Sequence, residues 1–342
     1  MRLIIALSFC FLFGNILSAQ YEGKMSGITL VAPRDSFSLD PMPALIDVNC
    51  EWVAVIPYAF TPPGETTVRF GQYQWWGESP HGAEETIKLA KTSGLKVMLK
   101  PQVWMHHGWV GDMDYASDKE WHQWEEEYKA YILRFAEIAS RQSVEVFCIG
   151  TEFKIALQKR EAFWFDLIKS VREIYDGMIS YCANWDEFED VGIWKELDLI
   201  GVSAYFPLIK DETPDIDALV KAWKPIKKRI QKLSYKFGKP VFFAEYGYLS
   251  LDGSTWNNWE LEKRRMDVDV NELAQANALE AMYKSFYNEK FWAGGFLWKW
   301  YPEGHGRRRY RDRDYTPQGK MAENVIRQWH SEINKKQFYL TP

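Results

Sequence analysis

Eight short apolar runs alternate with longer amphipathic segments along this chain of 342 residues. The runs are rich in Val, Ile and Phe, and several are apolar at every position rather than at alternate positions. Continuous apolar runs of this kind are typical of strands that are buried on both faces of a parallel sheet. The runs span residues 28–32, 52–60, 96–103, 144–150, 178–183, 199–205, 240–244 and 294–298.

The segments between the runs are predicted to be helices. They cover residues 83–93, 118–141, 160–176, 215–237, 271–290 and 321–334. Gly94, Gly177 and Gly238 follow the segments 83–93, 160–176 and 215–237, and a glycine often ends a helix. Pro225 lies inside the segment 215–237 and should break or kink that helix. Strands that alternate with helices in one uninterrupted domain predict an α/β fold, a (β/α)8 TIM barrel, rather than an open doubly wound sheet.

The N-terminus reads as a secretory signal peptide. Arg2 precedes an apolar stretch over residues 3–13, and Ala19 provides a small residue for cleavage. The stretch is short for a membrane span. We therefore expect residues 1–19 to be removed and residues 20–342 to form a secreted or periplasmic barrel domain with no stable membrane insertion; an uncleaved anchor is the alternative.

Charge and cysteine content argue against several classes of protein. A formal net charge of −5 gives no general attraction to nucleic acid or to an anionic membrane. Cys50, Cys148 and Cys182 remain after removal of the signal peptide, and their odd number and wide spacing form no disulfide framework, although one disulfide stays open. The six histidines lack metal-ligand spacing. We expect a monomer without a metal or another cofactor.

Two glutamates stand directly after apolar runs, Glu152 after the fourth run and Glu245 after the seventh. Active sites of barrels lie at the C-terminal ends of the strands, so both carboxyl groups are expected at the mouth. A carboxylate there is costly unless it is paired or its pKa is shifted. Structural ion pairs with Arg34, Lys100 or Lys299 are the alternative, but two such glutamates on opposite arcs favour catalysis.

Aromatic residues are abundant, with 17 Trp, 18 Tyr and 20 Phe. Many must pack in the core, yet flat apolar rings also suit the CH-rich faces of sugars. Trp75, Trp76, Trp104 and Trp185 follow strand runs and are candidate platforms for a sugar substrate. Asn184 is a further candidate for contact with a sugar hydroxyl, with a role in a turn as the alternative.

Four motifs resemble glycoside hydrolase family 113, the β-mannanase family of clan A. They are Ile149-Gly150-Thr151-Glu152-Phe153, Cys182-Ala183-Asn184-Trp185-Asp186, Phe243-Ala244-Glu245-Tyr246-Gly247-Tyr248 and Asp314-Tyr315-Thr316-Pro317-Gln318-Gly319-Lys320. The resemblance implies Glu152 as acid/base and Glu245 as nucleophile. It also implies that Tyr205 hydrogen-bonds the nucleophile and that Trp298 lies beneath the sugar that is cleaved. Most clan members place Asn where Thr151 stands, and family 113 is similar to this chain in that respect.

The resemblance therefore implies a retaining hydrolase of β-1,4-mannan or manno-oligosaccharides, in which the two carboxyl groups lie about 5–5.5 Å apart. Three alternatives stay open. Another clan A β-glycanase or an exo-acting β-mannosidase would keep the fold and the mechanism, whereas a non-catalytic carbohydrate-binding barrel would need no pair of carboxyl groups.

Overall fold

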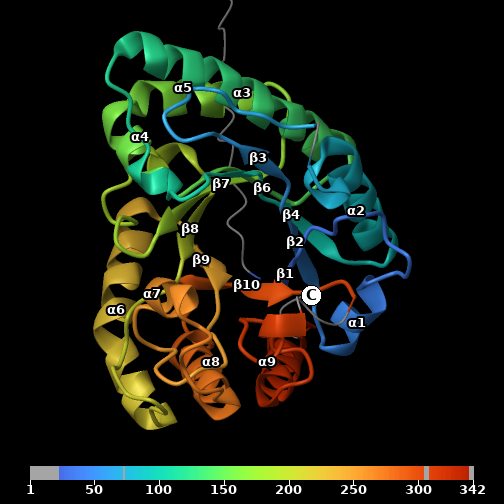
Figure 1. Cartoon of the computed structure of the whole chain (residues 1–342), viewed down its shortest axis with the longest axis vertical. Helices are drawn as coiled ribbons and strands as arrows, with labels where there is room; N and C mark the ends of the chain where they lie inside the picture. The colour runs from blue at the N-terminus through green and yellow to red at the C-terminus, as the bar shows by residue number, and fades with distance from the viewer. Residues whose placement is uncertain (1–22, 72–73, 304–307, 339–342) are drawn as a thin grey trace, which may run out of the picture.

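The computed structural model describes residues 23–71, 74–303 and 308–338. Eight parallel strands close into a barrel, and helices surround it (Figure 1), as the sequence predicts. In order around the barrel the strands are β1 (Met25–Leu30), β2 (Trp52–Val55), β4 (Lys96–Leu99), β6 (Val146–Thr151), β7 (Met178–Asn184), β8 (Leu199–Ser203), β9 (Val241–Tyr246) and β10 (Trp292–Trp300), which pairs with β1. The predicted signal peptide lies outside the described residues.

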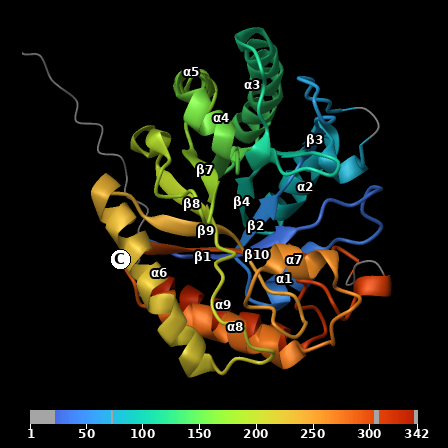
Figure 2. The same ribbon diagram turned by 60° about the vertical axis from the view of Figure 1, so that its left-hand side comes forward.

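Helices connect the strands on the outside of the barrel, which the turned view of Figure 2 also shows. They are α1 (Met42–Asp47), α2 (Pro80–Thr92), α3 (Asp118–Arg141), α4 (Lys154–Lys159), α5 (Glu161–Arg172), α6 (Ile216–Phe237), α7 (Asn258–Lys263), α8 (Glu272–Phe286) and α9 (Met321–Phe338). Short 3-10 turns are η1 (Trp76–Glu78), η2 (Val110–Asp112), η3 (Gly192–Glu196) and η4 (Arg308–Tyr310). In the described part of the chain, no helix is long and apolar enough to cross a membrane.

Local signals explain the helix ends. Ser117 caps α3, and its side chain and that of Glu120 each accept from the other residue's backbone N–H, which forms a capping box. Gly238 ends α6 in the left-handed region, which glycine adopts without steric cost. The helix α6 continues through Pro225, so the expected break does not occur.

Two of the predicted strands each divide at a proline. The run 52–60 gives β2 and then β3 (Tyr58–Phe60), and the run 96–103 gives β4 and then β5 (Gln102–Trp104). Pro57 and Pro101 stand at the breaks, where a missing N–H cannot continue the hydrogen-bond ladder. Beyond the breaks, β3 and β5 leave the barrel and pair in parallel as a separate two-stranded sheet above its mouth.

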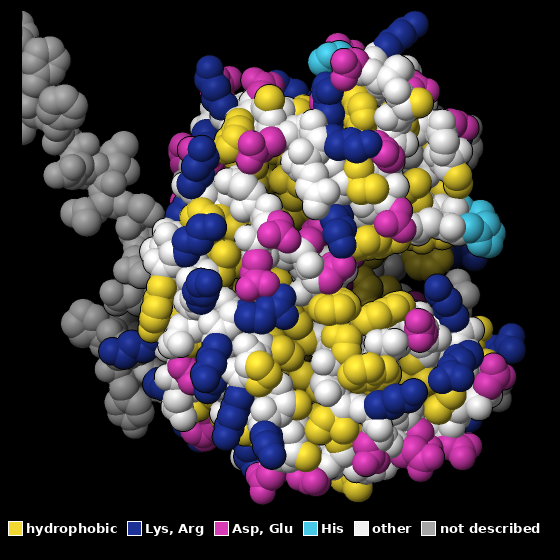
Figure 3. Space-filling model, turned by 90° about the vertical axis from the view of Figure 1, so that its left-hand side faces the viewer, with side chains coloured by type: hydrophobic (Ala, Val, Ile, Leu, Met, Phe, Trp, Pro, Cys, Tyr) yellow, Lys and Arg dark blue, Asp and Glu magenta, His cyan; other side chains and the backbone are white. Residues whose placement is uncertain are grey.

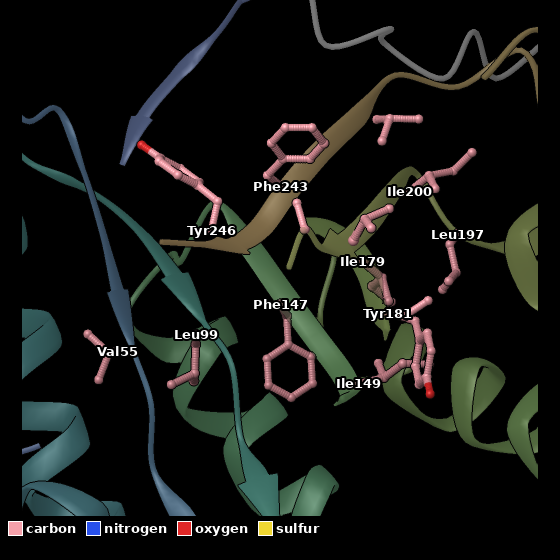
Figure 4. Packing of buried hydrophobic residues seen from close by; sticks show 14 of the residues in the cluster. Val55, Leu99, Phe147, Ile149, Ile179, Tyr181, Leu197, Ile200, Phe243 and Tyr246 are labelled. Atoms are coloured by element: carbon pink, nitrogen blue, oxygen red, sulfur yellow. The ribbon is translucent and has the colours of Figure 1, made fainter. Parts of the chain in front are cut away.

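Alternate residues of the strands divide the core into two clusters. Phe147 and Ile149 of β6 point outward into the large cluster between barrel and helices, which Figure 4 shows in part. Val146 and Cys148 point inward, into a smaller cluster that fills the barrel. The period of two is the ordinary geometry of a strand. The filled interior supports the residues at the mouth from below.

Candidate active site

Irregular strand register determines where the two glutamates point. Between β8 and β9 the pairs Val202–Phe243 and Ser203–Glu245 advance by one residue on β8 and by two on β9. This extra residue is a β-bulge. Phe243 and Tyr246 point outward toward the helices, and the bulge lets the two residues between them, Ala244 and Glu245, both point toward the inside of the barrel. The bulge therefore directs Glu245 to the barrel mouth.

The strand β6 has an equivalent irregularity before Glu152. Its residues advance by three between Cys148 and Thr151 while β7 advances by two. Glu152 itself has a φ of 59°, in the left-handed region that residues with a side chain seldom adopt. Such backbone conformations cost free energy and gather at functional sites. Its N–H donates to the carbonyl of Cys182, which fixes the turn at the end of the strand.

Three side chains hold Glu245, whose side chain is 9% exposed. The ammonium of Lys100, whose side chain has no exposed surface, forms an ion pair with Oε1 of Glu245, and Nε2 of Gln102 donates to the same oxygen at 2.8 Å. The hydroxyl of Tyr205 donates to Oε2 at 3.0 Å. Burial raises the pKa of the Tyr205 hydroxyl, and the neighbouring Glu245 adds to that effect, so Tyr205 remains a donor. One cation and two neutral donors therefore face the carboxyl group of Glu245.

Glu152 lies in a different electrostatic environment. Burial raises the pKa of its carboxyl group, and the negative charge of Glu245 raises it further. Trp109, whose Nε1 donates to Oε2 of Glu152 at 2.7 Å, opposes that shift in part. Among the residues that the structure describes, no lysine or arginine forms an ion pair with Glu152. Glu152 is thus biased toward the protonated form, beside a second carboxyl group that is paired with the ammonium of Lys100.

Contacts through β7 and β8 place the two glutamates near each other. The N–H of Glu152 donates to the carbonyl of Cys182, the thiol of Cys182 lies 3.2 Å from the hydroxyl of Ser203, and Ser203 pairs in register with Glu245. The two glutamates, at the ends of β6 and β9, are therefore connected through these contacts although 93 positions separate them in the sequence. Both line a single cleft of about 1220 Å³ at the mouth of the barrel.

The ion pairs considered as an alternative are present only in part. Lys100 does pair with Glu245, whereas Lys299 lies 3.5 Å from Asp314. The Lys100 pair does not turn Glu245 into a merely structural residue, because the other oxygen of Glu245 faces Tyr205 and the carboxyl group lines the cleft.

The aromatic candidates divide between two hollows. Trp298, Trp104 and Trp185 line the cleft, together with Tyr205 and Asn184. Trp75 lines an adjoining hollow of about 1030 Å³, and Trp104 and Trp298 line both hollows. Figure 3 shows a hollow bordered by hydrophobic side chains at one edge of the molecule.

Trp76 lies in neither hollow. Its ring packs edge-on against Phe37, with the ring centroids 5.4 Å apart, and against His81. We therefore remove Trp76 from the candidate platforms. Asn184 lines the cleft but its side-chain amide donates to Asp186 and its N–H donates to Glu187, which is the arrangement expected of a turn.

Several residues of the cleft carry no signal that the sequence analysis used. Gln102 and Trp109 contact the two carboxyl groups; Gln102 begins the short strand β5, and Trp109 lies in the loop that follows it. Asn258 and Trp259 belong to α7 in the long connection between β9 and α8. Within the described residues, no group of three or more His, Cys, Asp or Glu side chains is arranged to hold a metal ion.

Comparison with known proteins decides the family. A model of glycoside hydrolase family 113 matches residues 34–320. The chain belongs to glycoside hydrolase family 113. This family 113 glycoside hydrolase matches no curated protein sequence.

Solved structures agree with that membership. A family 113 β-mannanase of Alicyclobacillus acidocaldarius in complex with ManMIm is 29% identical and has a TM-score of 0.79, with 91% of this glycoside hydrolase and 98% of that chain covered. A structure and a complex of family 113 β-1,4-mannanase are each 27% identical, with TM-scores of 0.77 and 0.76. The match covers 90% of this chain and 99% of each of theirs.

Proposed function

We propose that this glycoside hydrolase cleaves β-1,4-mannan or manno-oligosaccharides with retention of anomeric configuration, with Glu152 as acid/base and Glu245 as nucleophile. The observation that carries the proposal is the pair of unlike carboxyl groups in one cleft: Lys100, Gln102 and Tyr205 contact Glu245, whereas Trp109 contacts Glu152. A retaining mechanism needs one protonated and one ionised carboxyl group on either side of the scissile bond.

The contacts assign the two steps. In the first step Glu152 gives its proton to the glycosidic oxygen, while Oε2 of Glu245 attacks the anomeric carbon and the leaving sugar departs as an alcohol. Tyr205 must release Oε2 as the new bond forms, while Lys100 and Gln102 continue to hold Oε1. In the second step Glu152 takes a proton from water, the hydroxide oxygen bonds to the anomeric carbon and Glu245 leaves as a carboxylate.

The preference for mannan rests on the structural neighbours. Three family 113 structures of 27–29% identity, spanning nearly the whole of their own chains, are described as β-mannanases or β-1,4-mannanases. A cleft that continues past Trp298 into the second hollow also suits a polymer that extends on both sides of the scissile bond. A purely binding barrel would not require the pair of carboxyl groups.

Hydrolysis of defined substrates tests the proposal. Mannohexaose labelled at its reducing end should give internal cleavage products, and cellohexaose should be cleaved at least tenfold more slowly if mannan is the substrate. Proton NMR should show the β-anomer of the product first. Initial formation of the α-anomer would exclude a covalent intermediate on Glu245.

Substitutions of the two glutamates test their roles. Glu245→Ala and Glu152→Gln should each lower kcat by orders of magnitude, because both side chains act on the reacting atoms. Glu126→Gln, on the exposed face of α3, is the matched control and should leave kcat unchanged. Retention of full activity in Glu245→Ala would reject the assigned nucleophile.

We also propose that the protein is secreted or periplasmic after cleavage following Ala19, and that it is a monomer. N-terminal sequencing of the exported protein should start at Gln20, and light scattering should give the mass of one chain.

A further inference from the structure

One outer helix of the barrel concentrates positive charge. The helix α6 carries six lysines and one arginine, against a single aspartate in its first turn. The whole chain has a formal net charge of −5, so the charge of α6 is opposite in sign to that of the rest of the protein. Figure 3, which views the side of the barrel that α6 borders in Figure 1, shows Lys and Arg side chains over that side. The net charge of the chain therefore conceals a local cationic surface.

Five of the six lysines form one stripe on the outer face of α6. Successive members are three or four residues apart, which is about one turn of an α-helix, so their side chains lie on the same face. The lysine stripe consists of Lys221, Lys224, Lys228, Lys232 and Lys236, and all five residues are exposed. At a rise of 1.5 Å per residue the stripe extends over about 22 Å.

The lysine stripe lacks neutralising acidic partners. The two other basic residues of α6 lie beside the stripe, where Lys227 pairs with Glu289 and Arg229 pairs with Glu189, each at 2.6 Å. In the part of the chain that the structure describes, no acidic side chain forms an ion pair with a lysine of the stripe. Like charges four residues apart on a helix destabilise it. An anionic partner would relieve that repulsion.

The shape of the stripe and the residue at its end indicate the kind of partner. A straight row of lysines on a convex helix suits an extended anionic surface better than a small anion. Tyr235 lies on the same face between Lys232 and Lys236 and is 70% exposed. Tyrosine is enriched where a membrane meets water, and clusters of four to eight basic residues on an amphipathic helix are typical of binding to anionic lipids.

The position of α6 is compatible with catalysis on such a surface. Residues of α6 line neither of the two hollows, so a partner on the stripe leaves the cleft open. The helix ends at Phe237, near the N-terminal ends of the strands and away from the mouth. The first described residues lie at this same end, where Lys24 donates to the carbonyl of Glu289, the residue that pairs with Lys227. An uncleaved N-terminal anchor would therefore reach a bilayer from the end of the barrel at which α6 stops.

We propose that the lysine stripe of α6, with Tyr235, is a docking surface for an anionic lipid bilayer. Binding is peripheral: the ammonium groups of the stripe pair with lipid phosphates, and the ring of Tyr235 lies among the headgroups. The lysine stems lie along the surface of the bilayer while their charged ends remain in water. This surface goes beyond the proposed function and does not depend on it, because none of its residues contacts the cleft.

Sedimentation with lipid vesicles tests the docking surface. The protein as exported is mixed at low salt with vesicles of equal parts phosphatidylglycerol and phosphatidylcholine, or with vesicles of phosphatidylcholine alone. The bound fraction is measured after centrifugation, and the same protein is tested for binding to soluble polygalacturonate, an anionic polysaccharide. Hydrolysis of soluble mannan is assayed separately, so that failure of the wild type as a mannanase rejects the proposed function without affecting the vesicle result.

Two triple variants with the same net charge separate the stripe from charge in general. The stripe variant is Lys224→Gln/Lys228→Gln/Lys232→Gln. The matched control neutralises three exposed lysines on α2, α3 and α4, as Lys88→Gln/Lys119→Gln/Lys159→Gln. Circular dichroism spectra of both variants should equal that of the wild type, because every substitution is at an exposed helical position.

Wild type and control should bind the anionic vesicles and not the neutral ones, and binding should weaken as NaCl screens the charges. The stripe variant should bind at least about tenfold more weakly, as expected when three lysines are removed from an anionic surface. Equal binding by the stripe variant and the wild type would overturn the proposal, as would an equal loss in the control. Equal binding to neutral vesicles would assign the binding to an apolar anchor and overturn it too. Binding to polygalacturonate without binding to anionic vesicles would overturn it in favour of an anionic polysaccharide.

Discussion

The ammonium of Lys100 is buried against Oε1 of Glu245 at the base of the cleft, and no part of the lysine side chain is exposed to solvent. Burial alone would lower the pKa of Lys100, but the charge of Glu245 and its hydrogen bond contribute to a net increase, so Lys100 is a permanent cation. It also lies 5.7 Å from the centroid of the Trp298 ring. This lysine therefore lies between Glu245, the proposed nucleophile, and the ring of Trp298.

Replacement of Lys100 by Met should impair both catalysis and stability. Removal of one partner of a buried ion pair costs about 3–5 kcal/mol, because the other charge remains buried without compensation. We expect kcat to fall by about a hundredfold or more and the free energy of unfolding to fall with it, since Glu245 loses its buried cation. Kinetics and urea unfolding would measure the two effects, and an unchanged free energy of unfolding would contradict this role of Lys100.

A milder substitution separates position from charge. Gln102→Ala removes a neutral donor from the same oxygen and leaves the cation in place. It should lower kcat and the free energy of unfolding by less than Lys100→Met does. Equal effects of the two variants would show that geometry rather than charge is responsible.

Replacement of Trp109 by Phe should move the alkaline limb of the pH–rate profile. The indole N–H donates to Glu152 and thereby stabilises its charged form, which lowers a pKa that burial and Glu245 together raise. Without that donor Glu152 keeps its proton to higher pH, so the alkaline limb of kcat/KM should move upward. The rate at the optimum should change by less than about tenfold, as for the loss of one hydrogen bond. A downward shift of the alkaline limb would contradict the assignment of Glu152 as the acid.

The sequence was sufficient to predict the barrel and the meeting of Glu152 and Glu245, for a topological reason. Continuous apolar runs indicate strands of a parallel sheet, and the C-terminal ends of all strands of a barrel meet at one mouth. The divided strands also had a signal, since Pro57 and Pro101 each interrupt an apolar run. Those two prolines predict that the barrel strands end there and that β3 and β5 are separate strands.

Other features of the site had no comparable signal. A β-bulge adds one residue to a strand. Because every residue of the run before Glu245 is apolar, the sequence of that run does not show whether a bulge is present. Trp75 and Trp76 are adjacent in the sequence, yet only tertiary packing decides that one lines a hollow and the other packs on Phe37. Trp259 lies in a long connection whose path depends on contact with Trp185. Side-chain direction in irregular segments is a property of the assembled fold.

The thiols of the described cysteines should be inert in the native protein. Cys50, Cys148 and Cys182 are free and buried, and burial raises the pKa of Cys50 and of Cys148 to about 12. The thiolate is the reactive form, so both protonation and burial oppose alkylation. Iodoacetamide at pH 8 should label none of these residues by mass spectrometry until the protein is unfolded, and a reductant should not change Tm. Rapid labelling of the native protein, or a Tm lowered by reductant, would show that the cysteines are exposed or paired.

His330 should limit stability at acid pH. It lies in α9 with no exposed surface, and burial lowers its pKa to about 3. The unfolded chain binds a proton at this residue below about pH 6.5, whereas the folded protein does not, so stability falls as pH decreases from 6.5 toward 3. At pH 4.5 the loss amounts to roughly 2–3 kcal/mol at 1.36 kcal/mol for each pH unit. Comparison of His330→Gln with wild type by urea unfolding at pH 8 and pH 4.5 would isolate this effect, because the buried carboxyl groups are common to both proteins. The wild type should lose about 2–3 kcal/mol more than the variant over this interval, and an equal loss in both would show that His330 is protonated in the folded state.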